Sequence, residues 1–272
     1  MLKKNVKKTF VIAEIGINHN GDIREAKKLI ASAKKAGADA VKFQTYITEK
    51  RTKKDSPIFD ILKKCELGFE SFKILKEYSE KLDIFFFSTA FDRESVDYLL
   101  KDLKIPLIKI ASFDSSNIDL IKQINKYKTD IIISLGMTKK KEIDPIIKKL
   151  SKNRDLALLH CVTSYPIKEE ESNLSAIHTL KKDYDNIIGY SDHTKGIKVP
   201  ILAVAAGAQI IEKHFMINKN DNCIDKAVSL DQKNFQEMIK GIRHTEKTLG
   251  NNKINIRDVE KKFLFLKRKK LS

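Results

Sequence analysis

Two histidines near the ends of apolar, β-rich runs are the first candidates for chemistry. His193 follows the run Ile187 to Tyr190 in the segment YSDHT, and His214 follows Gln209 to Glu212 in EKHF. Neutral imidazole is a common ligand of divalent metals. Two imidazoles brought side by side can therefore share one metal ion, with water, a carboxylate or a substrate in the other positions. Alternatively, each histidine is simply held by a hydrogen bond.

Two lysines stand inside other apolar runs, Lys42 in AVKFQ and Lys109 in LIKIA. A charge in an apolar strand is costly to bury unless it is paired or bound to a ligand. Ammonium groups beside hydroxyls suit a phosphate or a carboxylate. Hydroxyls follow several of the runs: Thr89, Ser112, Ser134 and Ser191. Alternatively, each lysine forms a structural ion pair with a carboxylate such as Asp114, or one of them forms a Schiff base as in aldolases.

Two carboxylates complete this set of candidates. Glu14 ends the first apolar run, so beside the lysines it can order a water molecule or exchange a proton with a substrate; alternatively, it anchors Lys42. Asp225 lies in the loop NKNDNCID after the last run. There it can bind sugar hydroxyls, or it can merely form a turn.

The elements that must position these residues are eight short β-rich runs, which alternate with helical patterns. This alternation is typical of βαβ units around a parallel sheet. Eight repeats in 272 residues match a single-domain α/β fold, the (β/α)8 TIM barrel, whose active sites lie at the carboxyl ends of the strands. The expected strands are Thr9 to Ile15, Ala40 to Gln44, Ile84 to Ser88, Leu107 to Ala111, Ile131 to Ser134, Leu156 to Cys161, Ile187 to Tyr190 and Gln209 to Glu212. Typical expected helices are Asp22 to Ala36, Lys139 to Leu150 and Val199 to Gly207.

A polar group stands at the end of every expected strand. In chain order these are Glu14, Lys42 with Gln44, Ser88 with Thr89, Lys109 with Ser112, Ser134, Thr163, Ser191 with His193, and Lys213 with His214. An open, doubly wound sheet gathers its ligands at one switch point and does not need this. The pattern therefore favours a barrel mouth that carries an active site.

Composition excludes several classes of protein. The net charge of +17 comes from lysines spread over most helical patterns, and no helix-turn-helix, zinc-finger spacing or RNP aromatic pair accompanies it, so we expect no nucleic-acid partner. The charge indicates a solvated surface or a field that attracts a small anion. No apolar run is long enough to cross a bilayer, so we expect no membrane association. Cys65, Cys161 and Cys223 lie outside any CxxC pattern, which favours the reducing cytoplasm.

Two segments depart from the regular alternation. The connection from Ile47 to Gly68 is long and polar in its middle, and it forms either a lid over the barrel mouth or an ordinary surface excursion. Beyond a barrel domain of residues 1–250, residues 251–272 form a basic tail or linker. Its basic and aromatic part is KKFLFLKRKK, from Lys261 to Lys270.

Eight segments in the correct order resemble the sialic acid synthase family, which includes N-acetylneuraminate, legionaminate and pseudaminate synthases. They are AEIGINHNG (13–21), VKFQTY (41–46), FSTAFD (87–92), IKIAS (108–112), LGM (135–137), LHC and YP (159–166), GYSDHT (189–194) and EKHF (212–215). One such motif alone is weak evidence. Eight in register over nearly the whole chain are specific.

The resemblance implies a transferase that condenses phosphoenolpyruvate with an open-chain N-acylated amino sugar. The acceptor would be N-acetylmannosamine or a 2,4-diacetamido hexose, and the products a nine-carbon 2-keto sugar acid and phosphate. His193 and His214 would hold Mn²⁺ or Mg²⁺, which polarises the sugar aldehyde. Glu14 corresponds to the acid near the attacking water. The residues that match the phosphoenolpyruvate site are Lys42, Thr89, Lys109, Ser112, Ser134 and Ser191, to which we add Thr163. Those that match positions facing the sugar are Gln44, Asp114, Tyr165 and Asp225.

Departures from the family pattern concern mainly the sugar side. The family commonly has a glutamate where Asp114 stands. Members also continue into a small antifreeze-like (SAF) domain that supplies an arginine to the sugar site of the other subunit, and this chain stops where the linker to it begins. The expected partners are a second copy of the chain and a separate capping-domain protein, unless the sequence is part of a longer chain. Two other functions stay open: a Schiff-base aldolase of keto sugar acids, and a non-catalytic barrel that binds phosphoenolpyruvate and sugar.

Overall fold

The computed structural model describes residues 8–150 and 155–268, and eight parallel strands close there into one barrel in the order β1 to β8. The strands are β1 Phe10–Gly16, β2 Ala40–Thr45, β3 Phe85–Ala90, β4 Leu107–Ile110, β5 Asp130–Ser134, β6 Leu156–Cys161, β7 Ile187–Asp192 and β8 Ile210–His214. Each lies within two residues of its predicted bounds. The predicted (β/α)8 TIM barrel is confirmed.

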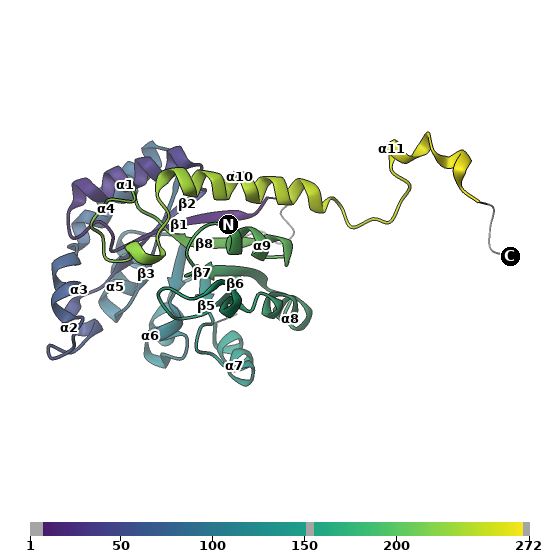
Figure 1. Cartoon of the computed structure of the whole chain (residues 1–272). Helices are drawn as coiled ribbons and strands as arrows, with labels where there is room; N and C mark the ends of the chain where they lie inside the picture. Colours follow the sequence, from purple (N-terminus) through teal and green to yellow (C-terminus); the bar gives the residue numbers. More distant parts are fainter. Residues whose placement is uncertain (1–7, 151–154, 269–272) are drawn as a thin grey trace.

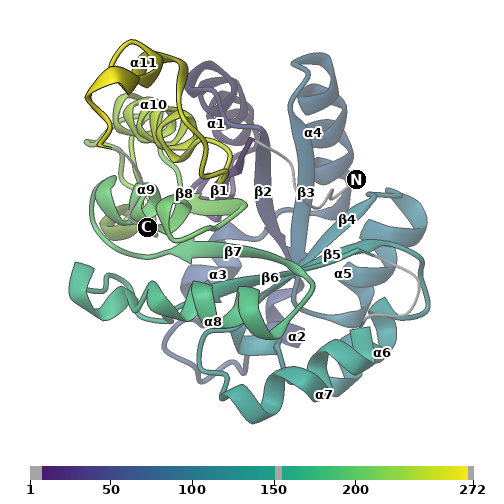
Figure 2. The same ribbon diagram turned by 90° about the vertical axis from the view of Figure 1, so that its right-hand side faces the viewer.

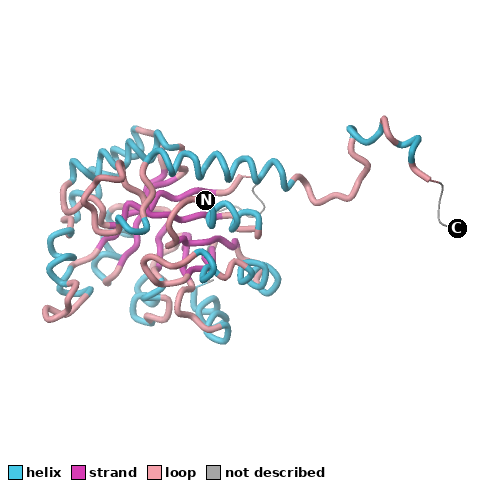
Figure 3. Tube along the Cα trace, viewed as in Figure 1, coloured by secondary structure: helices cyan, strands magenta, loops and turns pink. Residues whose placement is uncertain are grey.

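Helices surround the strands (Figures 1 to 3). They are α1 Ile23–Ala36, α2 Thr48–Arg51, α3 Phe59–Cys65, α4 Phe69–Lys81, α5 Arg93–Asp97, α6 Ile118–Ile124, α7 Lys140–Leu150, α8 Ser175–Asp183, α9 Lys198–Ala205, α10 Gln232–Leu249 and α11 Asp258–Lys261. Short helical turns lie at Tyr98–Asp102, Ser112–Asp114, Glu169–Ser172, Lys226–Val228 and Leu264–Leu266. The helix predicted from Asp22 begins one residue later, because the Asp22 side chain caps it by accepting a hydrogen bond from the Arg24 N–H. None of the described helices is both long and apolar enough to span a bilayer.

The barrel interior is apolar at the amino-terminal end of the strands. Its core includes Ile12, Phe87, Leu107, Ile132 and Ile210, all of them buried. Alternate residues of the same strands face outward into a larger core shared with the helices. Since side chains alternate along a strand, the residues two positions beyond this apolar layer also point inward. They form the floor of the barrel mouth.

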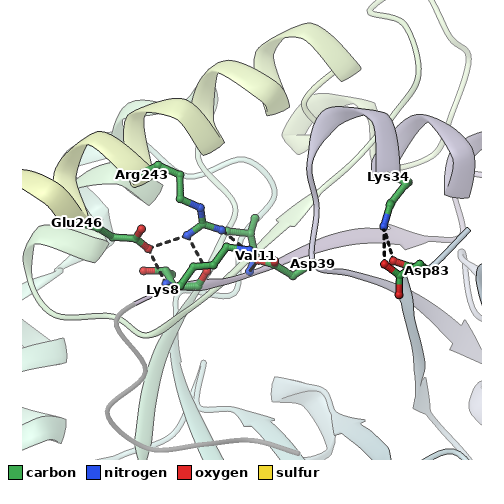
Figure 4. Close-up of polar contacts among 8 residues, drawn as sticks. Lys8, Val11, Lys34, Asp39, Asp83, Arg243 and Glu246 are labelled. Carbon is green, nitrogen blue, oxygen red and sulfur yellow. Dashed lines mark hydrogen bonds and ion pairs between the residues drawn. The ribbon is translucent and has the colours of Figure 1, made fainter.

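The last helix of the barrel is fastened to the first strand by Arg243 of α10 (Figure 4). Its Nη1 donates to the Thr9 carbonyl at 2.9 Å and to Glu246 Oε1 at 2.7 Å, and its Nη2 donates to Asp39 Oδ2 at 3.2 Å. Asp39 Oδ2 also accepts a hydrogen bond from the Val11 N–H at 2.9 Å. This network closes the ring of helices at the amino-terminal end of the barrel, away from the mouth.

The chain leaves the barrel after α10, and residues 251–268 extend away from it (Figure 1). They contain α11 and one further helical turn, and their apolar side chains are exposed, fully so at Ile254 and 81% at Phe265. The final part of the expected tail, residues 269–272, lies outside the described residues.

Candidate active site at the carboxyl end of the barrel

A cavity of about 200 Å³ lies at the carboxyl ends of the strands. Most of the predicted site residues line it: Glu14, Lys42, Gln44, Thr89, Lys109, Ser112, Ser134, Tyr165, Ser191, His193, His214 and Asp225. Two predicted residues do not. Thr163 lies beside Gly136, where its Oγ1 would be 2.1 Å from an added Cβ. Asp114 accepts a hydrogen bond from Asn117 Nδ2 at 2.8 Å.

Two polar residues that were expected at the mouth face away from it. Lys213 is fully buried on the outer side of β8, where its Nζ contacts Asp192 Oδ2 at 2.6 Å and the Thr194 carbonyl. Ser88 Oγ shares a hydrogen bond of 2.7 Å with Thr45 Oγ1. The sequence predicted Ser88 at the mouth together with Thr89, and Lys213 together with His214. For Ser88 and Lys213 this was wrong, because neighbours in a strand point to opposite faces.

The floor of the cavity is a buried cluster of charges. Lys42 Nζ is 2.7 Å from Glu14 Oε2, and it donates to Thr89 Oγ1 at 2.9 Å. Lys109 Nζ is 3.2 Å from Glu212 Oε1, while Glu212 Oε2 is 3.8 Å from Lys42 Nζ. The sequence suggested Asp114 as an alternative partner for the lysines. The structure shows Glu212 in that place.

Burial and charge act against each other in this cluster. Burial raises the pKa of Glu14, and the charge of Lys42 offsets only part of that effect. Burial would also raise the pKa of Glu212, but Lys109 and Lys42 together lower it to about 2. Burial lowers the pKa of Lys109 despite the nearby carboxylate, whereas the charges of Glu14 and Glu212 outweigh burial and raise the pKa of Lys42. Glu212 is therefore a fixed negative charge, and Glu14 is the carboxyl that is better placed to exchange a proton.

Hydroxyl groups line the same cavity as these lysines. Ser191 Oγ donates to Glu212 Oε1 at 2.9 Å. Ser112 Oγ accepts from the Gly136 N–H at 3.1 Å, and the Ser112 side chain also hydrogen-bonds to Cys161. Ser134 Oγ is buried and has no hydrogen-bond partner among the described residues. The ammonium groups and the unpaired Ser134 hydroxyl together could receive an anion.

The two histidines face each other, with ring centroids 5.7 Å apart. His193 Nδ1 is 2.9 Å from the Val162 carbonyl, which fixes the proton on Nδ1 and leaves Nε2 as the free electron-pair donor. Burial lowers the pKa of His193 to about 3, so its ring is neutral. His214 Nδ1 is 3.3 Å from Asp225 Oδ2, and this carboxylate raises the pKa of His214 although burial alone would lower it.

This donor set fits a divalent metal ion. A carboxylate that favours a proton on His214 also favours a metal cation in place of that proton. Among the described residues, however, no group of three or more histidine, cysteine, aspartate or glutamate side chains is arranged to hold a metal. A metal bound by the two imidazoles would thus keep positions for water or substrate.

The loop after β1 carries Asn18 and Asn20, whose side chains hydrogen-bond to the chain around Asp225. Asn18 Oδ1 accepts from the Asp225 N–H at 2.9 Å, and Asn18 Nδ2 donates to the Phe215 carbonyl at 3.0 Å. Asn20 Nδ2 donates to the Asn222 carbonyl at 2.7 Å. The asparagines of the NHNG segment therefore position Asp225 at the cavity.

Gln44 and Tyr165 form the outer wall. Gln44 Nε2 donates to Glu14 Oε1 at 3.3 Å, and Gln44 Oε1 accepts from Arg51 Nη1 at 3.1 Å. The Tyr165 ring lies 4.0 Å from that of His193, centroid to centroid. Seven further residues line the cavity that the sequence did not single out for the site: Ile17, Arg51, Phe91, Ala111, Phe113, Cys161 and Glu212. For Glu212 a signal existed, since it precedes His214 by two residues and must share its face.

The family is settled by comparison with known proteins. Residues 29–254 match the model of the NeuB family. The chain belongs to the NeuB family. It is 47% identical over 245 residues to an uncharacterized protein of Methanocaldococcus jannaschii, covering 89% of this chain and 72% of that one. It is 38% identical over 284 residues to the N,N'-diacetyllegionaminic acid synthase of Campylobacter jejuni, covering 98% and 85%.

The solved structures agree with this assignment. A crystal structure of the N-acetylneuraminic acid (sialic acid) synthetase from Leptospira borgpetersenii, in complex with citrate, superposes with a TM-score of 0.93 at 37% identity and covers 98% of this chain and 95% of that one. The predicted family is confirmed for this NeuB member, and so is the predicted class of enzyme, a sialic acid synthase-type transferase.

Proposed function

We propose that this NeuB-family chain condenses phosphoenolpyruvate with an N-acylated amino sugar. In this reaction C3 of phosphoenolpyruvate forms a bond with the aldehyde carbon of the open-chain sugar, and the aldehyde oxygen takes up a proton. Water adds to C2, and the C2–O bond to phosphate breaks. The products are a nine-carbon 2-keto sugar acid and inorganic phosphate. The observation that carries the proposal is the buried pair of lysines with hydroxyl groups, directly beside two imidazoles in one cavity.

The lysine side of the cavity would hold phosphoenolpyruvate. Lys42 and Lys109 are already desolvated and held in place by Glu14 and Glu212, so binding an anion requires little rearrangement. The Ser134 hydroxyl, which has no other partner, and the Ser112 hydroxyl would donate to the same anion, as would Thr89 and Ser191 after a rotation of their hydroxyls. Thr163 does not line the cavity and would act only indirectly, from beside Gly136 and Ser112.

The histidine side would hold the acceptor. Mn²⁺ or Mg²⁺ held by His193 and His214 would polarise the sugar aldehyde when bound. Glu14 reaches the lysine side as well, and its raised pKa suits it to orient or deprotonate the water that attacks C2. Gln44, Tyr165 and Asp225 would bind sugar hydroxyls along the outer wall. Asp114 would contribute its charge from beside this wall.

A screen of acceptors tests the proposal. Phosphate release would be followed with phosphoenolpyruvate and a series of N-acyl hexosamines, including 2,4-diacetamido sugars, with Mn²⁺ or Mg²⁺, and with and without a second polypeptide that carries a capping domain. We expect release only when all three components are present, and loss of release on chelation. Binding of phosphoenolpyruvate without turnover of any acceptor would instead support a non-catalytic barrel.

A Schiff-base aldolase is the second candidate, because burial lowers the pKa of Lys109 and so favours its nucleophilic form. Against it stands the ion pair of 3.2 Å with Glu212, which holds the ammonium group. Borohydride treatment in the presence of pyruvate distinguishes the two functions. A covalent adduct on Lys109 or Lys42 would favour the aldolase.

A further inference from the structure

Arg51 is a charged residue of the cavity that the proposed chemistry does not use. It ends α2, in the connection for which the sequence predicted either a lid or a surface excursion, and its side chain turns back to line the cavity. The guanidinium carbon lies 3.7 Å from the centroid of the Phe91 ring and 4.6 Å from that of Tyr46. Arg51 Nη1 also donates to Gln44 Oε1 at 3.1 Å. The side chain is therefore held in one orientation by two rings and one hydrogen bond.

The guanidinium of Arg51 retains unused donors. A guanidinium has five N–H groups, and the contact with Gln44 uses one of them. Within residues 8–150 and 155–268, no carboxylate lies within 4.0 Å of it. A guanidinium that is largely buried without an ion-pair partner is costly unless a ligand completes its contacts. The remaining N–H groups are thus available to an oxygen atom of a bound molecule.

The surroundings of Arg51 favour a neutral acceptor oxygen over an anion. The carboxylates of Asp114 and Asp225 are close enough to act on its charge, so they would repel a second anion placed beside it. Ile17 and Phe91 line the cavity at the same wall and belong to one apolar cluster with the buried Tyr46, which suits a small apolar group. An acetyl group offers both a neutral acceptor oxygen, in its carbonyl, and a small apolar group, in its methyl. A protonated free amine has neither, and the guanidinium would repel it.

We propose that Arg51 binds the acyl carbonyl oxygen of the acceptor amino sugar and thereby selects acylated over free amino sugars. This inference rests on the proposed function, since it assigns one contact of the acceptor in that reaction. The apolar cluster beside the guanidinium receives the acyl methyl group. Arg51 makes no contact with phosphoenolpyruvate, which binds on the lysine side of the cavity.

The test compares Arg51→Met with a matched control, Lys50→Met, at the neighbouring position of α2, where Lys50 pairs with Glu94 on the surface. Steady-state phosphate release is measured with phosphoenolpyruvate and N-acetylmannosamine, mannosamine or N-acetylmannosamine 6-phosphate. Loss of a charge-assisted hydrogen bond should raise KM for N-acetylmannosamine about ten- to hundredfold in Arg51→Met. KM for phosphoenolpyruvate should not change. We expect mannosamine to be a poor substrate of the wild type, and its KM should rise less in Arg51→Met. Lys50→Met should behave as wild type.

Gln44→Ala separates direct binding from an indirect effect. If Arg51 acted only by orienting the Gln44 amide, Arg51→Met would cause no further loss in the Gln44→Ala background. The proposal predicts a further loss. Thermal melting of each variant checks that the fold is intact.

Several results would overturn the inference: an unchanged KM for N-acetylmannosamine in Arg51→Met, a parallel rise in KM for phosphoenolpyruvate, or a larger loss with the 6-phosphate, which would indicate an anion site. If the wild type releases no phosphate with any acceptor, the proposed function fails on its own. Calorimetry of N-acetylmannosamine with wild type and Arg51→Met then decides about Arg51. Tighter binding by the wild type supports the contact, and equal or absent binding refutes it.

Discussion

Replacing Glu212 by glutamine removes the fixed negative charge from the cavity floor while keeping the shape of the side chain. The carboxylate is buried, and its Oε1 lies 3.2 Å from Lys109 Nζ and accepts from Ser191 Oγ at 2.9 Å. Its Oε2 lies 3.8 Å from Lys42 Nζ. In the variant, two buried ammonium groups would share the single remaining carboxylate of Glu14. Two effects follow, one on stability and one on anion binding.

The loss of stability follows from these distances. With an effective dielectric constant of about 20, the attraction is about 5 kcal/mol at 3.2 Å and about 4 kcal/mol at 3.8 Å. Folding of the variant no longer requires the Glu212 carboxylate to be desolvated, which offsets part of this loss. The net loss in the free energy of unfolding should resemble that for breaking a buried pair, about 3 to 5 kcal/mol. Glu237→Gln on α10 is the control, since it breaks an exposed pair with Lys240 at 2.7 Å. It should cost at most about 1 kcal/mol.

The assay is urea unfolding with and without phosphoenolpyruvate. An anion on the lysines replaces part of the missing negative charge, so phosphoenolpyruvate should stabilise Glu212→Gln more than it stabilises the wild type. Equal stabilisation of both proteins would refute the assignment of the lysine cluster as the anion site. A loss as small as that of Glu237→Gln would refute the electrostatic reasoning itself.

Three further predictions concern other parts of the site. Gly136→Ala should weaken phosphoenolpyruvate binding measured by calorimetry, because its Cβ would lie 2.7 Å from Ser112 Oγ; Gly68→Ala, with open space around it, should bind normally. His214→Ala should abolish binding of Mn²⁺ seen by electron paramagnetic resonance, and unaltered binding would exclude this metal site. Burial lowers the pKa of His19 to about 4 from 6.5. Between these pH values the imidazole binds a proton in the unfolded chain but not in the folded one. The free energy of unfolding should therefore fall by about 3 kcal/mol as pH drops from 6.5 to 4. Denaturation midpoints of His19→Asn should show a flatter pH profile, and a profile parallel to that of the wild type would contradict this cause.

The barrel could be predicted from the sequence because each strand is a compact apolar run bounded by helical patterns. Its mouth was predictable in part for the same reason, since strand ends in a barrel must meet. The errors came from side-chain direction. Lys213 was expected at the mouth, but its strand neighbour Glu212 is the residue that lies there. Strict alternation of side chains along the strand would have identified Glu212 instead.

Residues in loops could not be placed in this way. Arg51 lies in a connection without periodicity, and only the folded chain shows that it turns inward onto Phe91. Asp114 ends the short helical turn that follows β4. Its carboxylate accepts a hydrogen bond from Asn117 instead of lining the cavity. Such positions depend on tertiary contacts that no local pattern records.

The most direct test of the account uses phosphoenolpyruvate labelled with ¹⁸O at the oxygen that bridges C2 and phosphorus. The enzyme, Mn²⁺ and an N-acyl hexosamine that supports turnover would be added, and both products analysed by mass spectrometry. The proposed condensation yields one nine-carbon 2-keto acid per phosphate, with the label in the phosphate because the C2–O bond breaks. Label retained in the acid, or phosphate released without a nine-carbon product, would contradict it.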